Sequence, residues 1–304
     1  MESAINPKPS RLALAAIDIK LAHSVFALPF AILGGALAVD PSLGAGRVAL
    51  QFALIVVCMV SARTWAMLVN RLADAKIDAG NPRTANRAIA SGRLSVRDGW
   101  MMALASAGVF VAAASAFWPV LDNPWPAVLS LPVLGFIALY SYTKRFTALC
   151  HLFLGAALAV SPLAAALAIN PAYLSSSVTV WAIAGFVLFW VAGFDMIYAL
   201  QDIDFDRQAG LNSVPARLGW RGAIWISRVC HAAALGFMVW AWQSEPRFGE
   251  IFAVGGLVPL AGLLIAEHIV LAARGKAGLS MVFFTFNGLA SVVLGLAGLA
   301  DIMF

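Results

Sequence analysis

The chain has 304 residues, of which 62% are hydrophobic and only 12% charged, and its formal net charge is +5. Soluble globular domains average roughly 45–50% apolar and 25% charged residues, so this chain has too few charged side chains to cover a soluble surface. The composition therefore excludes a soluble globular domain, a disordered chain, a disulfide scaffold and a nucleic-acid-binding module. It is typical of a protein that crosses a membrane several times.

Long apolar segments predict about nine transmembrane helices, because roughly 20 apolar residues are needed to cross the hydrocarbon core of a bilayer. In chain order, the expected spans are 21–39, 48–69, 99–121, 123–143, two within 146–194, 222–243, 251–272 and 280–301. The long run is divided at Asn170-Pro171, because proline disfavours continuation of a helix. We therefore expect an all-α, polytopic membrane protein with a single domain over 1–304. Its polar tail, 1–20, lacks the apolar core of a signal peptide.

The positions of the basic residues set the expected orientation of these spans. If the N-terminus is cytoplasmic, nearly all of the 20 Lys and Arg residues lie on the cytoplasmic side. The exceptions are Arg47, Arg247 and, inside the second span, Arg63. The positive net charge thus indicates topology in an inner (plasma) membrane rather than a surface for nucleic acid. We expect the lipid bilayer as a partner, with the N-terminus inside and the C-terminus outside.

Acidic residues concentrate at the cytoplasmic ends of the second and sixth spans, although acids do little to orient a span. The residues that share a helical spacing are Asn70, Asp74 and Asp78 in one segment and Asp195, Tyr198, Asp202 and Asp206 in the other. Residues four apart share a face of a helix, about 6 Å apart along its axis, so each segment forms one oxygen-bearing stripe. Asp204 lies off the second stripe and is expected to be solvated or to cap a helix end.

Two facing carboxylate stripes would repel each other unless a cation lay between them. Carboxylate and amide oxygens suit Mg²⁺, which completes its coordination with water and substrate phosphate. The alternative is that the acids only neutralise nearby Arg and Lys side chains, which explains one stripe better than two. A basic, glycine-containing loop follows each stripe, within 73–98 and 202–220. Because arginine binds phosphate oxygens in a bidentate manner, we expect a metal–diphosphate site at this boundary of the membrane.

These motifs resemble those of the UbiA-type intramembrane aromatic prenyltransferases. The segments that carry the resemblance are Asn70 to Asp78, Asn81-Pro-Arg83 with Arg87, Tyr140-Ser-Tyr-Thr-Lys144-Arg145, and Asp195-x-x-Tyr198 with Asp202 and Asp206. The resemblance implies nine helices around a central lateral cavity that is open to lipid, with the cytoplasmic loops 73–98 and 202–220 capping the site. It also implies transfer of a polyprenyl group from polyprenyl diphosphate to an electron-rich aromatic ring.

The resemblance further implies roles for individual residues. The expected metal ligands are Asn70, Asp74, Asp78, Asp202 and Asp206, and the aspartates among them, together with Asp195, are the expected catalytic residues. Mg²⁺ held there would stabilise the departing diphosphate. Further positive charge near the diphosphate would come from Arg83, Arg87, Lys144 and Arg145. We expect some of these four side chains to order the loops rather than to bind diphosphate directly.

The chain departs from the family pattern in two places. Arg87-Ala-Ile stands where many relatives have Arg-Pro-Leu, so we expect a less rigid first loop, and Arg71 stands where Asp is frequent, which removes one potential acid. Arg71, together with Lys20-Leu-Ala-His23 and Phe26-Ala-Leu-Pro29, is more similar to the menaquinone branch, which implies 1,4-dihydroxy-6-naphthoate as the acceptor. The 4-hydroxybenzoate branch of ubiquinone synthesis is the alternative, as is another acceptor used within the family.

Three residues are candidates for binding the aromatic acid. Arg63 lies within a span, where a charge is costly and indicates function by default. It precedes Asn70 by seven residues, so we expect it to face the cavity and to pair with the acceptor's carboxylate or with Asp195; a structural pair with another span explains it equally well. Tyr198 is the second candidate. His23 is the third, although an interfacial histidine is the simpler interpretation.

Proteins of other classes could share some of these features. A secondary transporter also has repeated halves and intramembrane charge, but its acids would lie near the middle of the membrane beside broken helices. A lipid-head-group phosphotransferase would carry one dense acidic motif rather than acids divided between two spans. The sequence therefore favours the prenyltransferase over both.

Overall fold

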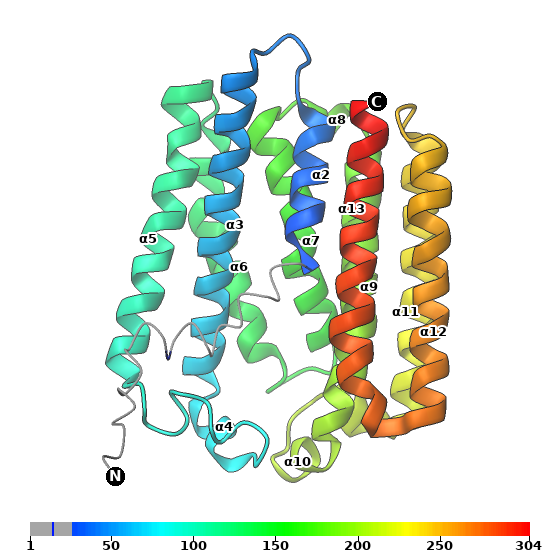
Figure 1. The fold of residues 1–304 in the computed structure, drawn as a ribbon. Coiled ribbons are helices and arrows are strands. Elements are labelled where there is room, and N and C mark those ends of the chain that lie inside the picture. The colour runs from blue at the N-terminus through cyan, green and yellow to red at the C-terminus, as the bar shows by residue number, and fades with distance from the viewer. Residues whose placement is uncertain (1–13, 15–25) are drawn as a thin grey trace, which may run out of the picture.

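The computed structural model describes Leu14 and residues 26–304, and the described part is a bundle of helices that run side by side (Figure 1). In this part, eight helical segments are long and apolar enough to cross a membrane. The principal helices are α3 (Ala45–Ala73), α5 (Val96–Leu121), α6 (Trp125–Thr143), α7 (Cys150–Ile169), α9 (Thr179–Ala199), α11 (Val214–Ser244), α12 (Val258–Arg274) and α13 (Asn287–Met303). The predicted all-α, polytopic architecture is confirmed.

The first expected span, 21–39, corresponds in the described residues to a shorter apolar helix, α2 (Leu28–Ala38). Residues 21–25 lie outside the described part. The described chain therefore accounts for the expected spans with eight long helices and α2. The short helices α4 (Ala75–Gly80) and α10 (Ile203–Gln208) follow α3 and α9 and lie at the same end of the bundle (Figure 1).

The predicted break after the fifth span is present. Helix α7 ends at Ile169, immediately before Asn170-Pro171, and a single short turn, α8 (Tyr173–Ser176), precedes α9. The backbone N–H of Asn170 still donates to the carbonyl of Ala166, at 2.8 Å, so the helix remains hydrogen-bonded up to the proline. A proline cannot donate the next helical hydrogen bond, which ends the helix at this point.

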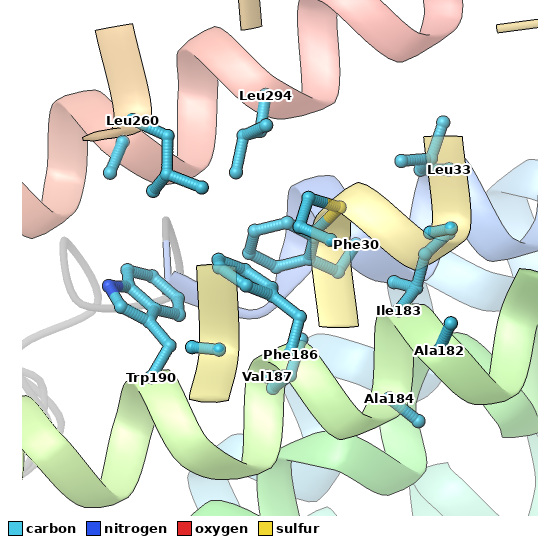
Figure 2. Close-up of a cluster of buried hydrophobic side chains, with 14 of the residues drawn as sticks. Phe30, Leu33, Ala182, Ile183, Ala184, Phe186, Val187, Trp190, Leu260 and Leu294 are labelled. Atoms are coloured by element: carbon cyan, nitrogen blue, oxygen red, sulfur yellow. The ribbon is translucent and has the colours of Figure 1, made fainter. Parts of the chain in front are cut away.

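Helix α9 forms the centre of the bundle. Of its most apolar stretch 72% is buried, more than in any other of the long helices. Figure 2 shows Phe186 and Trp190 of α9 beside Phe30 of α2. The rings of Phe186 and Trp190 stack with centroids 5.4 Å apart, and the indole N–H of Trp190 donates to Asn287 Oδ1 at 2.8 Å. Because α9 is enclosed by packed side chains, the acids at its end are held on a rigid support.

Helices α7 and α9 approach each other closely at Gly155. A Cβ atom at this position would lie 2.2 Å from the carbonyl oxygen of Leu188, so only glycine allows this separation. One helical turn before Gly155 lies His151, and Asp195 lies two turns beyond Leu188 along α9. The close approach therefore brings the polar residues of the two helices within contact distance.

Candidate active site

A polar cavity of about 280 Å³ lies at the end of the bundle that carries α4 and α10. Both predicted oxygen stripes line it, and their cavity-lining members are Asn70, Asp74, Asp78, Asp195, Tyr198, Asp202 and Asp206. The predicted basic residues that also line it are Arg63, Arg83, Arg87 and Lys144. Residues from motifs more than 100 positions apart thus surround one space.

Asp74 lies between α3 and α4, and its side chain is only 2% exposed. Lys144 Nζ is 2.6 Å from Asp74 Oδ2, and the Arg145 guanidinium is 3.3 Å from Asp74 Oδ1. Asn70, one helical turn earlier, donates a long hydrogen bond of 3.4 Å to Oδ2. Burial of a carboxylate is costly unless opposite charge lies beside it, and the loop after α6 supplies that charge.

Asp78 is held by its own loop. Arg87 Nη1 contacts both carboxylate oxygens of Asp78, at 2.8 and 2.7 Å. The hydroxyl of Thr84 donates to the backbone carbonyl of Asp78 at 3.1 Å. The loop after α4 therefore folds back over the first stripe.

The same loop reaches the second stripe through Arg83. Its Nε donates to Asp202 Oδ1 at 2.9 Å and its Nη2 to Asp202 Oδ2 at 2.5 Å, which is a bidentate ion pair. Asn81 also donates to Asp202 Oδ1, at 2.9 Å. Burial lowers the pKa of Arg83, but its hydrogen bonds to Asp202 and the negative charge nearby outweigh burial and raise the pKa above its ordinary value. Arg83 is therefore a permanent cation that joins the two motifs.

Asp206 is tied to the beginning of α11. The hydroxyl of Ser213 donates to Asp206 Oδ2 at 2.8 Å, and Ser213 Oγ itself accepts the backbone N–H of Ala216 at 3.1 Å. Ser213 is thus the N-cap of α11 and also a hydrogen-bond donor to an acid of the second stripe. Its side chain fixes both the helix end and the acid.

Asp195 pairs with His151. Asp195 was one of the two expected partners of Arg63, the other being the carboxylate of the acceptor, but among the described residues it is His151 that binds it. The His151 Nδ1 and Asp195 Oδ2 atoms are 2.7 Å apart. Sequence reasoning overlooked His151, because nothing in the spacing of α7 relates it to the acids of α9. The signal that could have identified it is its place inside an otherwise uncharged run, since an ionisable residue within a span indicates function.

Arg63 lies between two cavities. It lines the polar cavity and also an apolar cavity of about 300 Å³, which is enclosed mainly by α3, α5, α6 and α7. The Nε atom of Arg63 is buried and has no hydrogen-bond partner within the described residues. A buried guanidinium with an unsatisfied donor favours an anionic group in the adjoining cavity.

The remaining predicted site residues differ in position. The hydroxyl of Tyr198 accepts a hydrogen bond of 3.4 Å from Arg83, and its ring lies 4.1 Å from that of Phe283. Arg145 contacts Asp74 but is not among the residues that line the cavity. His23 lies outside the described residues.

The donor atoms fit a magnesium ion that is shared with a phosphate ligand. In the part of the chain that the structure describes, no three His, Cys, Asp or Glu side chains are close enough to form a complete metal site. Mg²⁺ does not need such a site, because it commonly binds one or two carboxylates and takes its other ligands from water and phosphate. Asp74 and Asp202, on opposite stripes of the cavity, offer that kind of partial coordination.

The fold and the cavity define a polytopic α-helical membrane protein with an acidic and basic site at one end of its bundle. The sequence model of the UbiA prenyltransferase family matches residues 27–295 of this chain. The chain therefore belongs to this family and is a prenyltransferase. The predicted family and enzyme class are thereby confirmed.

Relatives and solved structures agree with this assignment. The chain is 28% identical over 235 residues to a 4-hydroxybenzoate octaprenyltransferase of Nitrosomonas eutropha, covering 76% of this chain and 77% of the relative. It is 29% identical over 256 residues to the enzyme of that name in Shewanella pealeana, covering 82% and 83%.

Two solved structures share the fold. A UbiA homolog from Aeropyrum pernix K1, in its apo form, has a TM-score of 0.77 and 32% identity, covering 93% of this chain and 98% of that one. A UbiA homolog from Archaeoglobus fulgidus bound to GPP and Mg²⁺ has a TM-score of 0.71 and 20% identity, covering 96% and 100%.

Proposed function

We propose that this prenyltransferase transfers a polyprenyl group from polyprenyl diphosphate to an aromatic carboxylic acid, with Mg²⁺ as its cofactor. The observation that carries the proposal is the single cavity in which two carboxylate stripes, their basic partners and the unsatisfied Arg63 meet. The homolog bound to GPP and Mg²⁺ supports the donor and the metal. The expected metal ligands are Asn70, Asp74, Asp78, Asp202 and Asp206.

The diphosphate end of the donor would lie between the stripes. When bound, Mg²⁺ supplies positive charge that offsets the charge developing on the departing diphosphate. Arg83, Arg87 and Lys144 now pair with acids in the cavity, and their N–H groups can equally bond phosphate oxygens, because guanidinium and ammonium groups bind both anions. Arg145 would order the loop by holding Asp74.

The acceptor would lie deeper in the cavity, between Arg63 and Asp195. The guanidinium of Arg63 binds the carboxylate of the acceptor, and Asp195 accepts a hydrogen bond from a ring hydroxyl. The C1–O bond of the donor breaks, and its electron pair leaves with the diphosphate. A ring carbon beside the hydroxyl then forms a bond to C1 and loses its proton, with Asp195 as the nearby base. Tyr198 lies between Asp195, on the acceptor side of the cavity, and Asp202, on the diphosphate side.

Two acceptors fit this scheme, 4-hydroxybenzoate and 1,4-dihydroxy-6-naphthoate, and both carry a carboxylate and a ring hydroxyl. The names of the relatives support 4-hydroxybenzoate. Arg71 and the segment from Lys20 to Pro29 favour the naphthoate and a place in menaquinone synthesis.

The loops 73–98 and 202–220 would cap the cavity on the cytoplasmic side of an inner membrane, within a single domain over 1–304. The ion pair between Arg83 and Asp202, which joins the two loops, supports the capping role. The distribution of Lys and Arg supports the orientation.

The test is transfer by the purified protein in detergent, with Mg²⁺, a polyprenyl diphosphate and each acceptor supplied separately. We expect a prenylated aromatic acid by mass spectrometry, and the preferred acceptor decides between the two branches. The matched control is Asp202→Asn, which removes one charge at constant size. Protein that binds the donor but transfers it to neither acid would overturn the proposed acceptor class.

A further inference from the structure

We propose that His151 is a positioning residue for the acceptor. It holds one oxygen of Asp195 so that the other faces the ring hydroxyl of the aromatic acid, and it ties this acid to the loop that also holds Asp206. The proposal rests on the proposed function and deepens it, because it explains how the acceptor side of the cavity is set. Neither spacing nor family motif singled out His151.

The first observation is the contact itself. His151 Nδ1 and Asp195 Oδ2 are 2.7 Å apart, and the imidazole is only 3% exposed. The carboxylate of Asp195 is 24% exposed and lines the polar cavity. One oxygen is thus engaged by a buried donor, while the carboxylate still faces the space that the acceptor would occupy.

The second observation fixes the direction of this hydrogen bond. The backbone N–H of Val214 donates to His151 Nε2, at 3.3 Å and in a buried setting. An amide N–H can only donate, so Nε2 must be the unprotonated nitrogen. The proton of the neutral ring then lies on Nδ1 and is donated to Asp195. The contact with the backbone of α11 therefore makes His151 Nδ1 the donor and Asp195 Oδ2 the acceptor of the hydrogen bond between them.

The third observation links the two halves of the site. Val214 directly follows Ser213, whose hydroxyl donates to Asp206 Oδ2 at 2.8 Å. At the start of α11, Ser213 thus holds Asp206, an expected metal ligand, and the next residue, Val214, holds the imidazole that binds Asp195. A shift of this helix end would move both, so the placement of Asp195 is coupled to the loop that caps the donor.

The chemical consequence concerns the nucleophile. A ring hydroxyl that donates to a carboxylate gains negative charge on its oxygen, and this charge is shared with the neighbouring ring carbons that attack C1. If the carboxylate of Asp195 rotates away, both acceptor binding and this activation are lost. The donor side, at Asp74 and Asp202, is unaffected.

Side-chain shape allows the two contacts of His151 to be tested separately. The amide nitrogen of asparagine can take the place of Nδ1, so His151→Asn retains a donor to Asp195. The longer glutamine places its amide near the position of Nε2, so His151→Gln retains only the contact with Val214. His151→Leu removes both contacts at similar volume.

We expect His151→Leu and His151→Gln to lower kcat/KM for the acceptor by about 10- to 100-fold, as for loss of a hydrogen bond to a charged group. His151→Asn should stay within about threefold of wild type, since its donor remains. In all three variants, the KM for the donor and the slow release of diphosphate in the absence of acceptor should be unchanged. Combining His151→Leu with Asp195→Asn should add little to the loss in Asp195→Asn alone, because His151 acts through Asp195.

The matched control is His231→Leu, which removes another histidine with a 3% exposed side chain, on α11. It should leave the ratio of acceptor KM to donor KM at the wild-type value, whatever it does to the melting temperature. Wild-type acceptor kinetics in His151→Leu, or an equal loss of transfer and of acceptor-free diphosphate release, would show a merely structural role and overturn the proposal. Failure of the proposed function would differ, because the wild-type protein itself would then prenylate no hydroxylated aromatic acid, and both proposals would fall.

Discussion

Arg83 and Asp202, which lie on loops that follow different spans, form a bidentate ion pair with N–O distances of 2.9 and 2.5 Å. Asn81, two residues before Arg83, binds the same carboxylate and accepts the backbone N–H of Arg83 at 3.0 Å. The loop after the first stripe is therefore anchored on the second. This one ion pair thus joins the two motifs across the cavity.

Removal of the carboxylate of Asp74 or of Asp202 should abolish prenyl transfer. Asp74→Ala and Asp202→Ala each remove a proposed metal ligand, and metal stabilisation of the leaving group is worth several kcal/mol, so we expect losses of roughly 100-fold or more in kcat. The matched control is Asp204→Asn, because the Asp204 side chain is 79% exposed and its ion pair with Lys276 is 3.9 Å long. Folding is checked by size-exclusion chromatography of the detergent-solubilised protein. Near-wild-type turnover in both alanine variants would contradict the metal assignment.

Arg63→Leu should weaken binding of the aromatic acceptor more than binding of the prenyl donor. We expect the KM for the aromatic acid to rise by about 10- to 100-fold, because a charge-assisted hydrogen bond to the carboxylate is lost. The KM for polyprenyl diphosphate should change little. Arg63→Lys should recover only part of the effect, since an ammonium group lacks the bidentate geometry of guanidinium. If both KM values rise by the same factor, Arg63 has a structural role instead.

Chelation of divalent metal should stop transfer, and added Mg²⁺ should restore it. In Ser213→Ala, which frees Asp206 and removes the cap of α11, a higher Mg²⁺ concentration should be needed for half-maximal rate. Loss of the cap should also lower stability by about 1 kcal/mol. A magnesium titration of initial rates measures the first effect and thermal unfolding the second. Transfer that persists in a chelator would rule out the metal.

Gly155→Ala should destabilise the bundle. Its Cβ would lie 2.2 Å from the backbone of Leu188, so α7 and α9 must separate, at a cost of about 1–3 kcal/mol. The control is Gly135→Ala on α6, where a Cβ meets no atom within 4 Å. That change should be neutral or slightly stabilising, because alanine favours a helix. The comparison is made by thermal unfolding in one detergent, and equal melting temperatures would show that the helices can shift freely.

The sequence alone determined the features that depend on neighbours along the chain. Apolar segments long enough to cross a bilayer predicted the eight long helices of the described part, and Asn170-Pro171 marked the end of α7. The helical period of 3.6 residues placed Asn70 beside Asp74, and the two side chains are hydrogen-bonded. Spacing sufficed because it fixes which residues share a face of a helix.

The tertiary structure decided which faces meet. That Arg83 binds Asp202, and that Asp195 binds His151 rather than Arg63, depends on how α7, α9 and the loop after α4 pack against one another. His151 and Asp195, which are 44 positions apart, come into contact because Gly155 lets α7 and α9 approach each other closely. The periodicity within one helix cannot predict a contact between two helices. Local spacing determines a stripe of functional groups, whereas its partner is determined by packing between helices.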